Sequence, residues 1–162
     1  MPPVGQNFTP TKGPPRAFSA AVPPRAEARF TAREGNGEPR VVVTDSVSLV
    51  VAADAGAIVV TASHGGLLGG DPASAIKVDA LAAVYCDAGF GKDRAGITRL
   101  PALDRRGIAA VTVSADSARI GDGRSVHADG IVSCVNATAA AMGVLVGDSV
   151  QAFIDKVSRA RR

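Results

Sequence analysis

Three uninterrupted apolar runs constrain the fold of this chain more than any other feature. They span residues 57–61, 81–86 and 108–113 and consist mainly of Val, Ile, Leu and Ala. Runs of this kind, without alternation of polar and apolar residues, are typical of strands that are covered on both faces, as in a parallel sheet. Helix signals lie between them, so the sequence predicts a layered α/β domain. We expect a mostly parallel sheet of three to five strands flanked by helices.

The other elements follow from shorter patterns. The β-branched runs 40–44 and 47–51 predict two short strands or one bent strand. Asp71 and Pro72 predict the cap and first turn of a helix that runs to about residue 78. A second helix is expected over 97–106, beginning near Leu100 because Pro101 lies inside the segment.

Two further helices are predicted near the end of the chain. Ile131, Val135, Ala139 and Met142 form a stripe at helical spacing that ends at Gly143. Asp148 is expected to cap a last helix that carries Phe153 and Val157. Cys134 would then be a packing residue on the first of these two helices.

Residues 1–39 differ in composition from the rest of the chain. Eight of the ten prolines lie within residues 1–40, and large apolar residues are few there. Such a segment buries too little apolar surface to offset the entropy of ordering it, which predicts an extended or disordered Pro-rich arm before a single domain at 40–162. An alternative is an arm that wraps a neighbouring subunit, anchored by Phe8, Phe18 and Phe30.

The charge distribution argues against nucleic acid as a partner. The sequence has a formal net charge of +3, but residues 41–158 contain nine Lys and Arg against twelve Asp. A protein that binds phosphates along a strand is expected to carry its cations on the folded face. Only 4% of the residues are aromatic, which leaves few rings for stacking on bases.

The same inventory predicts a cytoplasmic protein that does not bind membranes. No stretch reaches the roughly 18 to 20 apolar residues that span a bilayer, and the N-terminus has no apolar core of signal-peptide length. Cys86 and Cys134 stand apart without a zinc-type spacing, so we expect free thiols. Neither a metal nor another cofactor is predicted.

Each of the three apolar runs ends in a loop rich in glycine and polar residues, at 63–66, 87–96 and 114–124. In a parallel sheet these loops emerge at one edge, and ligands of open α/β folds bind just beyond the carboxyl ends of the strands. We therefore expect a ligand site there. The predicted catalytic residues are Ser63, His64 and Asp87, and the predicted binding residues are Gly65, Gly66, Lys92, Ser117, Arg119 and Asp122.

These residues suggest particular roles. Adjacent glycines can turn backbone N–H groups toward an anion or a carbonyl oxygen, beside His64 as acid, base or hydrogen-bond donor. Asp87 would orient His64 or act as a base. Lys92 and Arg119 would hold an anionic group, with Asp122 steadying the guanidinium.

Other interpretations of the loops stay open. Ser63 could belong to a hydrolase triad with Asp116 or Asp122 and His127, although glycines are poor formers of the helix that should follow such a serine. The glycines could also serve only a tight turn. Gly91-Lys92 is not a phosphate-binding loop of the P-loop type, because Cys86 stands where its first glycine would be. Cys86 could be a nucleophile, but a core thiol is the stronger hypothesis.

Two functions follow. The first is a small enzyme of hydrolase or isomerase/lyase type that acts on a small polar or carboxylate-bearing metabolite. The second is a non-catalytic ligand-binding or assembly domain, and in either case we expect a homo-oligomer. The two functions are distinguished by whether Ser63, His64 and Asp87 converge within hydrogen-bond reach, as expected for an enzyme.

Overall fold

A computed structural model describes residues 26–162 as one six-stranded sheet whose strands lie side by side in chain order. The strands are β1 (Arg29–Arg33), β2 (Val41–Thr44), β3 (Ile58–His64), β4 (Ala82–Cys86), β5 (Ala109–Val113) and β6 (Val132–Val135). β2 to β5 are parallel, whereas β1 and β6 run antiparallel at the two edges. The predicted α/β class with a mostly parallel sheet is confirmed, with six strands in place of three to five.

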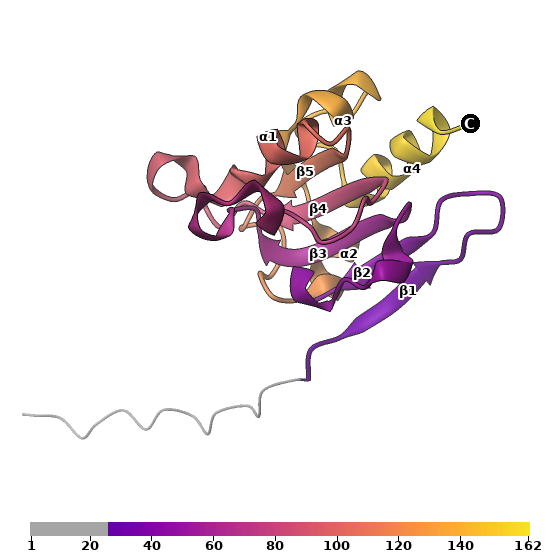
Figure 1. The fold of residues 1–162 in the computed structure, drawn as a ribbon, viewed down its shortest axis with the longest axis horizontal. Coiled ribbons are helices and arrows are strands. Elements are labelled where there is room, and N and C mark those ends of the chain that lie inside the picture. The colour runs from indigo at the N-terminus through magenta and orange to yellow at the C-terminus, as the bar shows by residue number, and fades with distance from the viewer. Residues whose placement is uncertain (1–25) are drawn as a thin grey trace, which may run out of the picture.

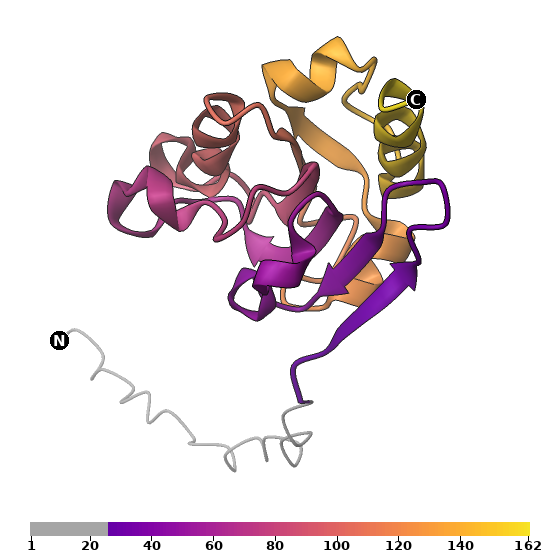
Figure 2. The same cartoon turned by 45° about the vertical axis from the view of Figure 1, so that its right-hand side comes forward.

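The sheet separates two apolar cores (Figures 1 and 2). One core packs the sheet against α2 (Gly123–Asp129), α4 (Val150–Ala160) and Ala139 of α3 (Ala137–Ala141). The other packs the opposite face against α1 (Arg99–Asp104) and the short 3-10 turns that connect the parallel strands. Burial on both faces explains why β2, β4 and β5 are apolar without alternation.

All connections between parallel neighbours cross on the α1 face. They contain the 3-10 turns η1 (Val47–Leu49), η2 (Ala52–Asp54), η3 (Leu68–Gly70), η4 (Pro72–Ser74) and η5 (Lys92–Ile97). A crossover between parallel strands is right-handed in almost all proteins, so strands added in one direction place their connections on one face. The opposite face is thereby left for α2 and α4, which come after the last parallel strand.

Regular structure begins before residue 40, where the sequence predicts the folded domain to start. β1 pairs antiparallel with β2, and Phe30 packs against the core on the α4 face. Arg33 donates to the carbonyl of Pro39 and to the hydroxyl of Ser158 on α4, which holds the hairpin to the end of the chain. The rest of the predicted arm, including Phe8 and Phe18, lies outside the described residues.

Two predicted elements are shorter than the sequence suggests. The run 47–51 is a 3-10 turn rather than a strand, because the Ser46 hydroxyl caps it at the Ser48 amide. The predicted helix 71–78 is reduced to one 3-10 turn, although Asp71 caps it and Pro72 opens it as expected.

The predicted helix from Ile131 to Gly143 is wrong. Its first half is the edge strand β6, whose backbone pairs with β5, and only Ala137–Ala141 is helical. Asn136 separates the two, since its Oδ1 caps α3 at Ala139 while its Nδ2 donates to carbonyls of the α1 region. Cys134 therefore lies half-buried on a strand, not on a helix.

The last helix starts at Val150 as its apolar pattern predicts, but its cap is Ser149 rather than Asp148. Asp148 instead accepts from the Leu145 amide and pairs with Lys156. Within residues 26–162 no helix combines the length and apolar character that crossing a bilayer requires.

One polar contact is buried in the α1-face core. The Tyr85 hydroxyl donates to the carbonyl of Ala75 at 2.8 Å, and the Arg99 guanidinium lies 5.2 Å from the Tyr85 ring centre. Arg99 also donates to the carbonyls of Ser74 and Ala75. The two side chains together fasten the connection between β3 and β4 to the sheet.

We expect Tyr85 to link stability to alkaline pH. Burial raises the pKa of its phenol well above the usual range, although the charges of Arg99 and Arg106 lower it in part. The unfolded chain loses this proton near pH 10, so stability is complete below about pH 10 and falls as pH rises above it. Tyr85 is the single tyrosine and the chain has no tryptophan, so tyrosinate absorbance should rise only as circular dichroism reports unfolding. Ionisation near pH 10 in a folded protein would contradict this.

Candidate functional site

The loops that follow β3, β4 and β5 meet at the carboxyl edge of the sheet. We call them loop one (residues 65–67), loop two (87–98) and loop three (114–122). The Gly65 amide donates to the Cys86 carbonyl, and the Arg99 amide donates to the Gly65 carbonyl. The Leu67 amide donates to the hydroxyl of Thr98. Loop one therefore lies against both ends of loop two.

Asp87 joins loop two to loop three. Its side chain is buried, and Oδ1 accepts from the Gly89 amide at 2.8 Å and from the Ala115 amide at 3.1 Å. A carboxylate that accepts two amide hydrogen bonds is held in place by the fold. In this structure Asp87 positions the backbone of two loops rather than the ring of His64.

Loop three then returns across the sheet edge. The Gly121 amide donates to the Ala62 carbonyl of β3, and the Gly123 amide donates to Oδ1 of Asp45 at the end of β2. Because β4 and β3 lie between β5 and β2, this segment passes over their carboxyl ends before α2 begins. The space beneath it becomes a cavity.

Gly65 and Gly66 allow loops one and two to pack closely. A Cβ on Gly65 would lie 2.5 Å from the Gly96 carbonyl oxygen, and one on Gly66 would lie 2.6 Å from that of Ala95. Both amides already donate within the described chain, to Cys86 and to His64. The glycine pair thus allows the two loops to approach each other closely. Its N–H groups are already used in hydrogen bonds within the chain and are not directed at a site for an anion.

His64 is exposed at the end of β3 and has a defined hydrogen-bond pattern. Its Nδ1 lies 3.1 Å from the Gly66 amide, which can only donate. Nδ1 therefore carries no proton, and the neutral ring holds its proton on Nε2. The ring lines a cavity of about 290 Å³ together with Phe90, Gly91 and Ala95 of loop two.

Ser63 has a separate partner. Its hydroxyl accepts from the Val47 amide at 2.8 Å, on the far side of β3 from the α2 core. Within residues 26–162 no hydrogen bond links Ser63, His64 and Asp87 to one another. The structure brings the three residues to one sheet edge but not into a triad.

His127, the histidine of the alternative triad, lies elsewhere. Its ring contacts the amide of Gln151 at 3.2 Å, between α2 and α4. Burial lowers the pKa of this imidazole. Cys86 is buried in β4 and its thiol accepts from the Ala88 amide, while burial raises its pKa, as expected for a core thiol.

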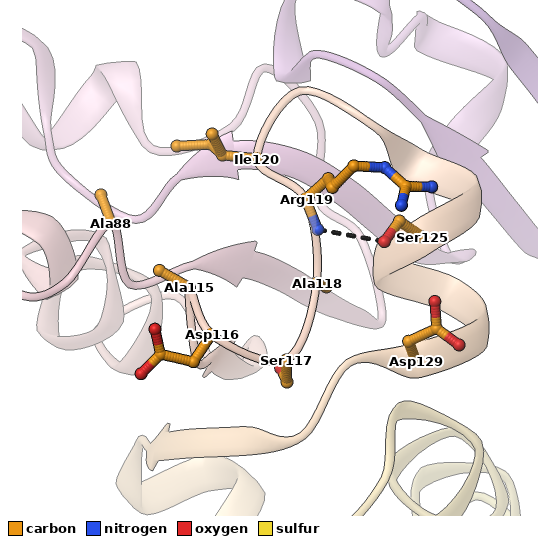
Figure 3. A pocket seen from close by; sticks show the side chains of 9 residues that line it. All are labelled: Ala88, Ala115, Asp116, Ser117, Ala118, Arg119, Ile120, Ser125 and Asp129. Atoms are coloured by element: carbon orange, nitrogen blue, oxygen red, sulfur yellow. Dashed lines mark hydrogen bonds between the residues drawn. The ribbon is translucent and has the colours of Figure 1, made fainter.

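A cavity of about 670 Å³ lies between loop three, Ala88 of loop two and α2 (Figure 3). Alanines and Ile120 form its apolar wall, and Ser117, Ser125, Asp116 and Asp129 supply its polar groups. Neither Asp116 nor Asp129 has an ion pair with another described residue. Ala88 lines this cavity and that of His64, so the two adjoin there.

The predicted binding residues of loop three take different positions. Ser117 lines the cavity, but its hydroxyl donates to the Ser114 carbonyl and accepts from the Ile131 amide. Arg119 extends toward the start of α2, away from Ala88 (Figure 3), and pairs with Asp122 at 3.2 Å. A ligand carboxylate would have to compete with Asp122 for this guanidinium. Lys92 is exposed on loop two and lines neither cavity.

Loop two has a backbone that is unusual for its residues. Ala88, Phe90, Asp93 and Arg94 have φ values of 51°, 68°, 55° and 56°. Positive φ is uncommon outside glycine, and each such residue costs on the order of 1–3 kcal/mol. Sequence analysis marked this loop through Gly89, Gly91 and Lys92 but gave no signal for Ala88 or Phe90.

Residues missed by the sequence analysis include Ala88, Phe90, Ser125 and Asp129. Ser125 and Asp129 lie on α2, which was not predicted, so no pattern placed them beside loop three. No group of three or more His, Cys, Asp or Glu suited to a metal occurs in the described part of the chain.

Comparison with protein-family models, with curated proteins and with solved structures finds no match to this chain. The function must therefore be inferred from the chemistry of the site itself.

Removal of the Asp87 carboxylate is expected to loosen loops two and three together. Asp87→Ala leaves two amides without their acceptor, which should lower the free energy of unfolding by about 2–3 kcal/mol. Amide exchange at Gly89 and Ala115 should rise in parallel. Asp87→Asn keeps a carbonyl oxygen and is the matched control. Equal stability of Asp87→Ala and wild type in urea would refute this role.

Proposed function

We propose that the protein binds a small polar metabolite at the carboxyl edge of the sheet, with Nε2–H of His64 as the hydrogen-bond donor that polarises a carbonyl oxygen in an isomerase or lyase type of reaction. The observation that carries the proposal is the hydrogen bond from the Gly66 amide to Nδ1 of His64. It fixes which ring nitrogen holds the proton. A neutral imidazole that is oriented in this way beside a cavity can polarise a ligand carbonyl by donating a hydrogen bond to it.

The cavities suggest how a ligand would lie. An acceptor oxygen of the ligand, such as a carbonyl oxygen, would accept from Nε2 of His64 in the smaller cavity. The remainder would extend past Ala88 into the larger cavity, whose polar groups come from loop three and α2. A combined site of this size suits a metabolite rather than a macromolecule.

The charges of the larger cavity favour one class of metabolite. Asp116 and Asp129 are unpaired within the described chain, and Arg119 is already neutralised by Asp122. Hydroxyl or amine groups on the ligand would donate hydrogen bonds to these carboxylates, whereas a carboxylate on the ligand would be repelled by them. A polar metabolite with donor groups opposite its reacting carbonyl fits best.

Isomerase or lyase chemistry is favoured over hydrolysis by a serine nucleophile. The hydroxyl of Ser63 accepts from Val47, and no described histidine lies in hydrogen-bond contact with it to take its proton. His64 in its present tautomer donates a hydrogen bond from Nε2 rather than accepting one there. Such a hydrogen bond stabilises the negative charge that develops on a carbonyl oxygen as a neighbouring bond breaks or a double bond moves.

The test uses the two histidines as internal reporters. The chain has only His64 and His127, so ring resonances can be followed separately while a panel of hydroxy- and amino-carbonyl compounds is titrated. A ligand should shift the His64 ring and raise the midpoint of thermal unfolding by several degrees at about 100 times its dissociation constant.

Two variants decide the outcome. His64→Gln should abolish the thermal shift of any compound found, while His127→Gln on α2 should leave it unchanged. A shift that survives His64→Gln, or a panel in which every compound leaves His64 unperturbed, would exclude the proposed site.

An assembly role is the second candidate, and one surface favours it. Ile131, Leu145 and Val146 are exposed beside the edge strand, with Leu145 at 64% and Val146 at 66%. The segment that carries the latter two is hydrogen-bonded to Val132 through Gly147 and Asp148, so the three exposed residues lie on adjacent backbone segments, which we call the apolar patch. Exposed apolar patches of this kind often mark subunit interfaces.

If the chain is a homo-oligomer through this patch, Leu145→Ser combined with Val146→Ser should reduce its mass in light scattering to that of a monomer. Leu68→Ser is the matched control, because Leu68 is equally exposed on a different loop. An oligomer that persists in the double variant would place the interface elsewhere.

A further inference from the structure

A third cavity lies on the opposite side of loop two, between this loop, α1 and β6. It encloses about 420 Å³ and shares no lining residue with the two cavities described above. Its apolar surface comes from Ile97, Leu100, Pro101 and Val135. This surface is large enough for a short hydrocarbon chain.

Most polar groups on its walls are already satisfied. Asn136 makes four hydrogen bonds through its amide, to Ala110, Ala139, Leu100 and Ile108. The Asp104 carboxylate accepts from both amides at the start of α3 and from the Thr138 hydroxyl. The Thr98 hydroxyl accepts from Leu67 and donates to Ala95. These groups present little to a ligand.

Asp93 and Arg94 are the exceptions, and Arg94 is the cation of the cavity wall. It has no ion pair with any residue of the described chain, yet its guanidinium is held in position. The guanidinium carbon lies 5.2 Å from the Phe90 ring centre, and Nη2 lies 3.6 Å from Sγ of Cys134. A cation that is pre-positioned at an apolar cavity without a carboxylate partner is suited to bind an anion.

The backbone that presents Arg94 is strained. Asp93 and Arg94 both lie in the left-handed region, at φ 55° and 56°. Non-glycine residues rarely adopt this conformation in succession, and strained backbone often occurs at ligand sites. Arg94 lines the cavity from this strained segment.

We propose that this cavity binds a short-chain monocarboxylate, with the carboxylate on the Arg94 guanidinium and the hydrocarbon chain against Ile97, Leu100 and Val135. The opposite preference, for an amine, would have to come from Asp93, which also lines the cavity and forms no ion pair with another of residues 26–162. If Arg94 determines binding, the cavity prefers the carboxylate. If Asp93 determines binding, it prefers the amine of the same chain length.

Cys134 provides a reporter inside the cavity. It is half-buried there, whereas Cys86, the only other cysteine, is fully buried in β4. Alkylation of Cys134 by iodoacetamide, followed by mass spectrometry of the full-length chain, then measures access to the cavity. The probes are hexanoate, hexanamide and hexylamine, which share one chain and differ in head group.

Hexanoate should slow alkylation of Cys134 about tenfold at about nine times its dissociation constant, because only the empty cavity reacts. Hexanamide should protect less, and hexylamine least. Protection is expressed as the ratio of rates with and without probe, since Arg94 also changes the thiol's own reactivity.

Three variants test whether binding depends on the charges of Arg94 and Asp93 rather than on the shape of the cavity. Arg94→Gln should remove protection by hexanoate, and Asp93→Asn should strengthen it. Arg105 is exposed in the turn that follows α1, so Arg105→Gln should leave protection by hexanoate unchanged. Thermal unfolding is used to confirm that each variant is folded. Protection by hexylamine in preference to hexanoate, equal protection in Arg94→Gln, or no protection by millimolar hexanoate would each overturn the proposal.

Discussion

The carboxyl edge of the sheet depends on one buried carboxylate. Asp87 directly follows β4 and accepts hydrogen bonds from an amide of loop two and an amide of loop three. Without this acceptor, the tight turn after β4 and the start of the return segment after β5 would lose their shared support. Asp87 therefore holds the start of the strained loop two and the start of loop three, which covers the cavity.

The cavity beneath loop three arises in a different way from the ligand crevice of a doubly wound sheet. In those folds a crevice opens where the strand order reverses and neighbouring crossovers go to opposite faces. Here β2 to β5 follow one another without a reversal, and their crossovers share the α1 face. The crevice arises instead because loop three returns over the strand ends and is tied to Ala62 and Asp45. The cavity is thus a product of the connection from β5 to β6, which contains α2.

The sequence predicts the central strands well because their signal is local. The runs at 57–61, 81–86 and 108–113 are apolar on both faces, and their parallel arrangement brings the following loops together. β1 and β6 carry no such signal, since each is a strand only through pairing with a neighbour. The spacing of Ile131, Val135 and Ala139 suits a helix equally well, and contacts distant in sequence decide against it, namely pairing with β5 and the Asn136 bonds to distant carbonyls.

The candidate site was predictable in location but not in detail. Its side-chain partners lie far away in sequence: Ser63 bonds to Val47, and Asp87 bonds to Ala115. Loop two also faces two cavities, with Phe90 and Gly91 toward His64 and Arg94 and Ile97 toward α1. Ligands that prefer different positions of this loop would alter each other's affinity by the same factor in both directions. Loop two would then couple the binding of two chemically different ligands.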